Sequence, residues 1–111
     1  TPLDFTQATT IGARESELGE PRRGKYDDNY IINGGSQSLV LAARVYEPKS
    51  GRTMEVLTDQ PSVQLYTGNK RGFCLETQHY PDSINHPHFP SPIVRPGSPF
   101  KTETVFAFSN K

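Results

Sequence analysis

Proline and glycine interrupt this chain so often that little room is left for long helices. Ten prolines and nine glycines occur among its 111 residues, and six of the prolines lie between residues 81 and 99. Proline lacks a backbone donor, so it breaks helix interiors and is confined to the edges of sheets. We therefore expect an all-β fold of short strands and many turns, in which residues 79–99 form an ordered loop.

A β-hairpin is the clearest local prediction. The segment SLVLAARVYE at 38–47 and the segment RTMEVLTDQ at 52–60 flank the turn PKSG, which ends in Gly51. Apolar and β-branched runs on both sides of a tight turn predict antiparallel strands, and Gly51 can adopt the positive φ that such a turn requires.

Further strands are expected at 62–67, 73–78 and 100–109, with a short pairing at Ile93 and Val94. In the last of these strands Phe100, Phe106 and Phe108 alternate onto one face, which should pack on a core. Residues 1–29 are polar and are expected to form an irregular lead-in, where the spacing of Ile11 and Leu18 predicts one short helix.

Charge and composition limit the classes of ligand that this chain is expected to bind. Twelve Lys and Arg balance twelve Asp and Glu, so no positive field favours nucleic acid or an anionic membrane, and a small neutral molecule is the expected ligand. No apolar stretch has the length of a membrane span or of a signal-peptide core, and a single cysteine excludes an intrachain disulfide. One domain in a cytoplasmic setting is expected.

The segment GFCLETQHYPDSINHPHFPS at 72–91 contains the most informative acid. Alternation places Cys74, Glu76 and Gln78 on one face of a strand, so a carboxylate shares its face with a thiol and an amide. A buried Glu76 would have a raised pKa and suit general-base catalysis. The alternative is an exposed Glu on the solvent face of an edge strand, which the pattern alone favours.

The sequence gives weaker support to a metal site and to a cysteine nucleophile. His79, His86 and His88 with Glu76 are residue types that bind Zn²⁺ or Fe²⁺, but the surrounding prolines favour a loop, and we predict no metal site. Cys74 has no base beside it in sequence, and a small thiol in a strand is expected to be buried for packing.

The same segment resembles the C-terminal signature of the aldose 1-epimerase (galactose mutarotase) family, in which a GFCLETQ strand runs into a PDSxNHPxFP loop. The resemblance continues, in family order, through TPLDFTQATTIGAR at 1–14, KYDDNYII at 25–32, AARVYEPKSGRTMEV at 42–56, TDQPSVQLYTGN at 58–69 and IVRPGSPFKTETVFAFS at 93–109. Members are about three times longer than this chain, near the upper end of single-domain lengths. The resemblance thus implies that residues 1–111 are the C-terminal part of a large antiparallel β-sandwich.

The resemblance also implies a reaction and its residues. Glu76 would remove the proton from the anomeric hydroxyl of a hexose such as galactose or glucose, while a histidine protonates the ring oxygen. Asp27 and Gln64 match residues that hydrogen-bond the sugar, and no cofactor is implied. From the residues alone, Asp27 suits a turn or cap equally well, and Gln64 suits an exposed strand position.

This sequence departs from the family pattern at three places. The family's catalytic histidine lies upstream of the matched region. Asp28 replaces a histidine of the family's YDHN pattern, and a second carboxylate beside Asp27 would raise the pKa of one of the two. The link between Asn69 and Gly72 is short where members carry about twenty residues, far beyond a common loop.

Three hypotheses follow. The chain is part of a working aldose 1-epimerase, a catalytically silent carbohydrate-binding module, or a structural fragment of that fold. In the last case, uncovered sheet edges are expected to drive self-association, because unpaired strand edges seek partners.

Overall fold

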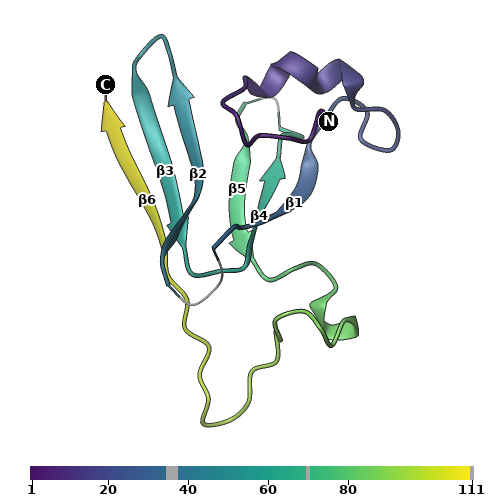
Figure 1. Cartoon of the computed structure of the whole chain (residues 1–111), viewed down its shortest axis with the longest axis vertical. Coiled ribbons are helices and arrows are strands. Elements are labelled where there is room, and N and C mark those ends of the chain that lie inside the picture. Colours follow the sequence, from purple (N-terminus) through teal and green to yellow (C-terminus); the bar gives the residue numbers. More distant parts are fainter. Residues whose placement is uncertain (35–37, 70, 111) are drawn as a thin grey trace.

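The strands form two antiparallel sheets, as the computed structural model shows for residues 1–34, 38–69 and 71–110 (Figure 1). One sheet has the order β1-β4-β5, built from β1 (Asp27–Ile31), β4 (Ser62–Tyr66) and β5 (Cys74–Gln78). The other has the order β2-β3-β6, built from β2 (Val40–Glu47), β3 (Arg52–Thr58) and β6 (Thr104–Asn110). This sandwich-like arrangement confirms the all-β prediction. Within the described ranges, no helix has the length and apolar character needed to cross a membrane.

The β2–β3 hairpin is confirmed. Gly51 has a φ of 73° and its amide donates to the carbonyl of Glu47 at 2.9 Å. The Glu47 carboxylate also accepts hydrogen bonds from the backbone amides of Lys49 and Ser50 at 2.9 and 2.8 Å, which fixes the turn. Because the turn and both strands are encoded locally, the sequence predicted them well.

β1 begins at Asp27, whereas residues up to 29 were expected to be irregular. The strand forms because β4 pairs with it along its whole length, from Asp27 opposite Tyr66 to Ile31 opposite Ser62. Just before β1, the backbone amide of Thr67 donates to the carbonyl of Tyr26 at 2.9 Å and extends the pairing. Pairing with a distant segment therefore overrides the polar local sequence.

The N-terminal segment covers one face of the β1-β4-β5 sheet. It contains the predicted short helix, a 3₁₀ helix η1 (Ile11–Glu17), and its residues pack on a core of Leu18, Tyr26 and Leu65. Tyr26 is fully buried, and its hydroxyl donates to the carbonyl of Pro2 at 2.8 Å. Phe5 packs edge-on against Tyr26 at 5.2 Å between ring centroids. The polar lead-in thus supplies part of the core.

Three threonines connect the two sheets. The hydroxyl of Thr104 on β6 lies 3.0 Å from that of Thr58 on β3 and 2.7 Å from that of Thr77 on β5. Thr58 and the neighbouring Val56 are fully buried. The face of β5 that contains Thr77 is therefore the face turned toward the second sheet, and the face that contains Glu76 is turned away from it.

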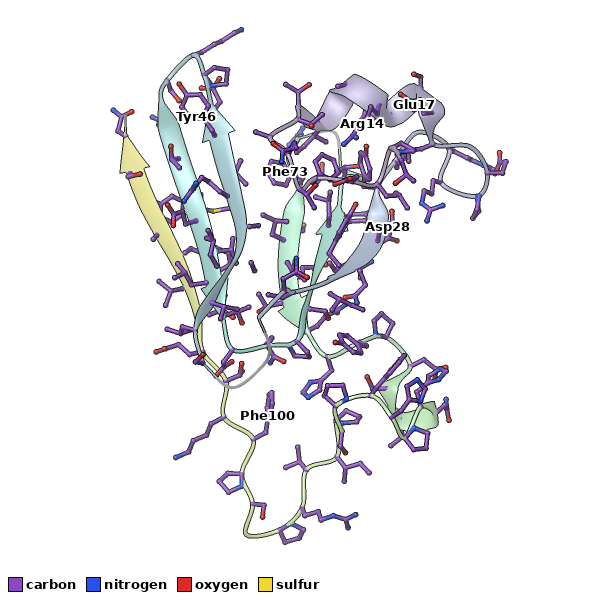
Figure 2. The ribbon with its side chains drawn as sticks, viewed as in Figure 1. Arg14, Glu17, Asp28, Tyr46, Phe73 and Phe100 are labelled. Carbon is purple, nitrogen blue, oxygen red and sulfur yellow. The ribbon has the colours of Figure 1, made fainter. Side chains whose placement is uncertain are left out.

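The prediction that the aromatic face of the last strand packs on a core was wrong. Phe106 and Phe108 are 47% and 76% exposed. Phe100 precedes the strand, which begins only at Thr104, and lies in the long loop below the sheets (Figure 2). The physical reason is that β6 is an edge strand of its sheet, so its side chains have a neighbouring strand on one side only.

Residues 79–99 form the expected loop, but its details differ from the prediction. The loop contains a single 3₁₀ turn, η2 (Ser83–Asn85). The short pairing lies between Arg95 and Ser98 instead of at Ile93 and Val94.

Candidate functional site

Strand register brings the three predicted site residues onto one face of the β1-β4-β5 sheet. Gln64 lies directly opposite Asn29 on β1 and directly opposite Glu76 on β5. Directly opposed residues in antiparallel strands share a face, and Asp27 shares the face of Asn29 because it is two residues away. We call the face that contains Asp27, Asn29, Gln64, Glu76 and Gln78 the polar face.

Asp27 and Gln64 are in direct contact. The Gln64 Nε2 donates to Asp27 Oδ1 at 2.9 Å. Asp27 lies on a strand, so the alternative that it caps a turn was wrong. Within the described part of the chain, Asp27 Oδ2 accepts no hydrogen bond, and the residue is exposed. One carboxylate oxygen therefore fixes Gln64 while the other faces solvent.

Glu76 is exposed on an edge strand, which is the arrangement that the sequence pattern favoured. The alternative of a buried Glu76 was therefore wrong. The expectation of a buried thiol also failed, because Cys74 is exposed at the start of the same strand, opposite Tyr66. Tyr66 is itself 38% exposed. The β5 end of the polar face is thus open to solvent.

Asp28 belongs to the opposite face, away from Asp27. Its carboxylate accepts hydrogen bonds from Arg22 Nη2 at 2.6 Å and from Arg22 Nε at 3.0 Å. These bonds hold the pKa of the Asp28 carboxyl below its usual value. The expectation that a second carboxylate would raise a pKa at this point is therefore corrected for Asp28, which is paired with Arg22 of the N-terminal segment.

The three histidines make their contacts in and around the loop. His79 packs against Phe100 with ring centroids 5.6 Å apart. His86 stacks on Phe89 at 4.7 Å, lies 5.8 Å from His88 between ring centroids, and pairs with Asp82 at 3.3 Å. These contacts give each ring a packing role, and among the described residues no histidine hydrogen-bonds to Glu76.

Two further side chains complete the polar face. Gln78 Nε2 donates to Gln64 Oε1 and to Asn29 Oδ1, both at 3.0 Å. The sequence pattern had placed Gln78 on the face of Glu76, but it gave no role to this amide or to Asn29. The signal available in the sequence was the two-residue spacing of Asn29 from Asp27 and of Gln78 from Glu76.

Comparisons with known proteins show which proteins the sequence of this chain resembles. The sequence model of the family described as aldose 1-epimerase matches residues 1–107. Galactose mutarotase from Homo sapiens is 41% identical and that from Bos taurus 40% identical, each over 98% of this chain and 35% of the relative. Aldose 1-epimerase from Escherichia coli strain K12 is 28% identical over 97% of this chain and 36% of the relative.

These alignments also show how the chain compares in length with its relatives. The chain spans about a third of the curated relatives it matches. The alignment to the human protein covers 125 positions, more than the 111 residues of the chain, so it contains gaps. A match over nearly the whole chain nevertheless shows the family: this chain belongs to the aldose 1-epimerases.

Proposed function

We propose that the chain provides the general base and two sugar-binding side chains of an aldose 1-epimerase that interconverts the α and β anomers of hexoses such as galactose and glucose. The observation that supports this most strongly is the placement of Asp27, Gln64 and Glu76 on one solvent-facing sheet face. The family membership and the names of the relatives support the same reaction.

The chemistry requires a general base, a proton donor and the reversible opening of the sugar ring. The Glu76 carboxylate takes the proton of the anomeric hydroxyl, the bond between C1 and the ring oxygen breaks, and a proton donor protonates that oxygen. Rotation about the C1–C2 bond and reversal of these steps close the ring on the other face of the aldehyde. No electron is transferred, so the reaction itself calls for no cofactor.

Sugar recognition is assigned to Asp27 and Gln64. A carboxylate accepts hydrogen bonds and an amide both donates and accepts, so the pair can satisfy neighbouring hydroxyls of a hexose. Asp27 Oδ2 is the acceptor for the sugar, and Asp27 Oδ1 holds Gln64 in place. The net charge of zero suits this neutral ligand.

Polarimetry of freshly dissolved α-D-galactose and α-D-glucose tests the proposal. The complete enzyme that contains this chain should accelerate mutarotation, and Glu76→Gln in it should lower the enzymatic rate by about 10²-fold or more, because the amide cannot accept the proton. Glu17→Gln is the matched control, since Glu17 is exposed on η1. Equal acceleration by the wild-type protein and Glu76→Gln would contradict the role of Glu76.

A catalytically silent carbohydrate-binding module is the second candidate. The observation in its favour is that the histidines pack in the loop and leave Glu76 without an imidazole partner among the described residues. In that case calorimetric titration with galactose should show binding that Asp27→Asn and Gln64→Leu weaken and Glu76→Gln leaves unchanged, with no mutarotation by any of these proteins. Absence of both binding and mutarotation would exclude both candidates and favour a structural fragment.

A further inference from the structure

We propose that Gln78 is a positioning residue that fixes which way the Gln64 amide points, and thereby sets the arrangement of donors and acceptors on the polar face. This inference rests on the proposed sugar site. It concerns a residue that acts through Gln64 and not one that performs the chemistry.

Gln78 is well placed to hold its neighbours. Its amide nitrogen donates both of its protons, one to Gln64 Oε1 and one to Asn29 Oδ1, each at 3.0 Å. Its backbone is fixed as well, because the hydroxyl of the fully buried Ser62 donates to the Gln78 carbonyl at 2.8 Å. Gln78 therefore spans the sheet from β5 across β4 to β1.

The direction of these hydrogen bonds has a consequence for Gln64. A glutamine amide has an acceptor end and a donor end of nearly the same shape, so only its partners decide the orientation. Because Gln78 donates to Oε1, the Gln64 Nε2 must turn toward Asp27, where it donates at 2.9 Å. In the reverse orientation, two amide NH₂ groups would face each other and a carbonyl would face the Asp27 carboxylate.

The same reasoning applies to Asn29. Its Oδ1 accepts from Gln78, so its amide nitrogen is the end left for other partners. The polar face thus offers amide donors from Gln64 and Asn29 beside the free acceptor of Asp27. This alternation of donor and acceptor matches a vicinal diol, in which each hydroxyl donates once and accepts once.

The test replaces the donor of Gln78 with an acceptor of the same shape. In Gln78→Glu the new carboxylate competes with Asp27 for the Gln64 Nε2, so the Gln64 amide should lose its single orientation. The Gln64 side-chain ¹H–¹⁵N signals of the isotopically labelled full chain should shift, and their nuclear Overhauser contacts should be divided between β1 protons and position 78. The affinity for galactose should fall about tenfold.

Two further variants keep the test decisive. Gln7→Glu makes the same chemical change on an exposed residue of the N-terminal segment and should alter neither readout. Gln78→Met removes the donor without adding charge, and it should loosen Gln64, with averaged side-chain signals and a smaller loss of affinity. This variant decides the matter if Gln78→Glu does not fold.

The outcomes separate this inference from the proposed function. Unchanged Gln64 side-chain signals in both Gln78 variants would overturn the positioning role, whatever happens to sugar binding. If the wild-type chain does not bind galactose, the proposed function fails. The Gln64 signals still decide whether Gln78 orients that amide.

Discussion

At the residue scale, the pair of Arg22 and Asp28 ties the N-terminal segment to β1. Its hydrogen bonds depress the pKa of Asp28, so the folded state gains stability above the ordinary value of 3.8 and loses it as the pH falls through the lower folded-state pKa. Asp28→Asn should therefore lower the free energy of unfolding at pH 7 by about 1 kcal/mol, a modest figure because Arg22 is partly open to solvent.

Urea unfolding at pH 7 and at pH 3 checks this prediction. The difference between the wild-type protein and Asp28→Asn should shrink at pH 3, because below the ordinary value of 3.8 the unfolded state binds a proton that the folded Asp28 resists. Glu17→Gln, a change at an exposed residue of η1, again serves as the control. A difference that stays constant between the two pH values would contradict the account of Asp28.

Some residue environments could be predicted from the sequence and others could not. Glu76 was identified from its motif, and its exposure was the outcome that alternation favoured. Exposure of Cys74 was not predicted, because it depends on which strands lie at a sheet edge. The contact between Asp27 and Gln64 joins residues 37 positions apart, and the register that creates it cannot be read from local pattern.

At the element scale, the β2–β3 hairpin depends on one backbone conformation. Gly51 has a φ of 73°, which residues with a Cβ atom adopt only at a cost. Gly51→Ala should lower the free energy of unfolding by about 1 kcal/mol, visible as a lower urea midpoint with an unchanged slope. Gly19→Ala is the matched control, since apart from its two chain neighbours no atom lies within 4 Å of the position that its methyl group would occupy. Equal midpoints for the two variants would contradict the role assigned to Gly51.

The elements that could be predicted are those whose partners are close in sequence. The hairpin, β4 and β5 followed from apolar alternation and turn residues. β1 could not be predicted from its polar sequence, because its strand conformation comes from pairing with β4 some thirty residues away. The resemblance to the family assigned Asp27 and Gln64 to one predicted sugar site, and periodicity alone offered no connection between them.

At the scale of the whole molecule, both sheets have open edges. β6 is an edge strand that exposes Phe106 and Phe108, and such an edge favours pairing with another chain. We propose that isolated chains associate through β6. Sedimentation velocity should show a concentration-dependent dimer or larger species, and Phe108→Lys should shift it toward the monomer because lysine disfavours edge pairing.

Val94→Lys provides the control for this prediction. Val94 is 59% exposed but lies in the loop outside the named strands, so the same apolar-to-lysine change there should leave association unaltered. A monomer at all concentrations, or equal association of the wild-type protein and Phe108→Lys, would contradict association through β6.

We propose that the polar face of the β1-β4-β5 sheet binds a hexose. The most direct measurement is a titration of the ¹⁵N-labelled chain with D-galactose, followed by two-dimensional NMR. Saturable shifts are expected on β1, β4 and β5 around Asp27, Gln64 and Glu76, and they should be lost in Asp27→Asn. Shifts confined to the β2-β3-β6 sheet or the proline-rich loop, or no saturable shift at all, would contradict it.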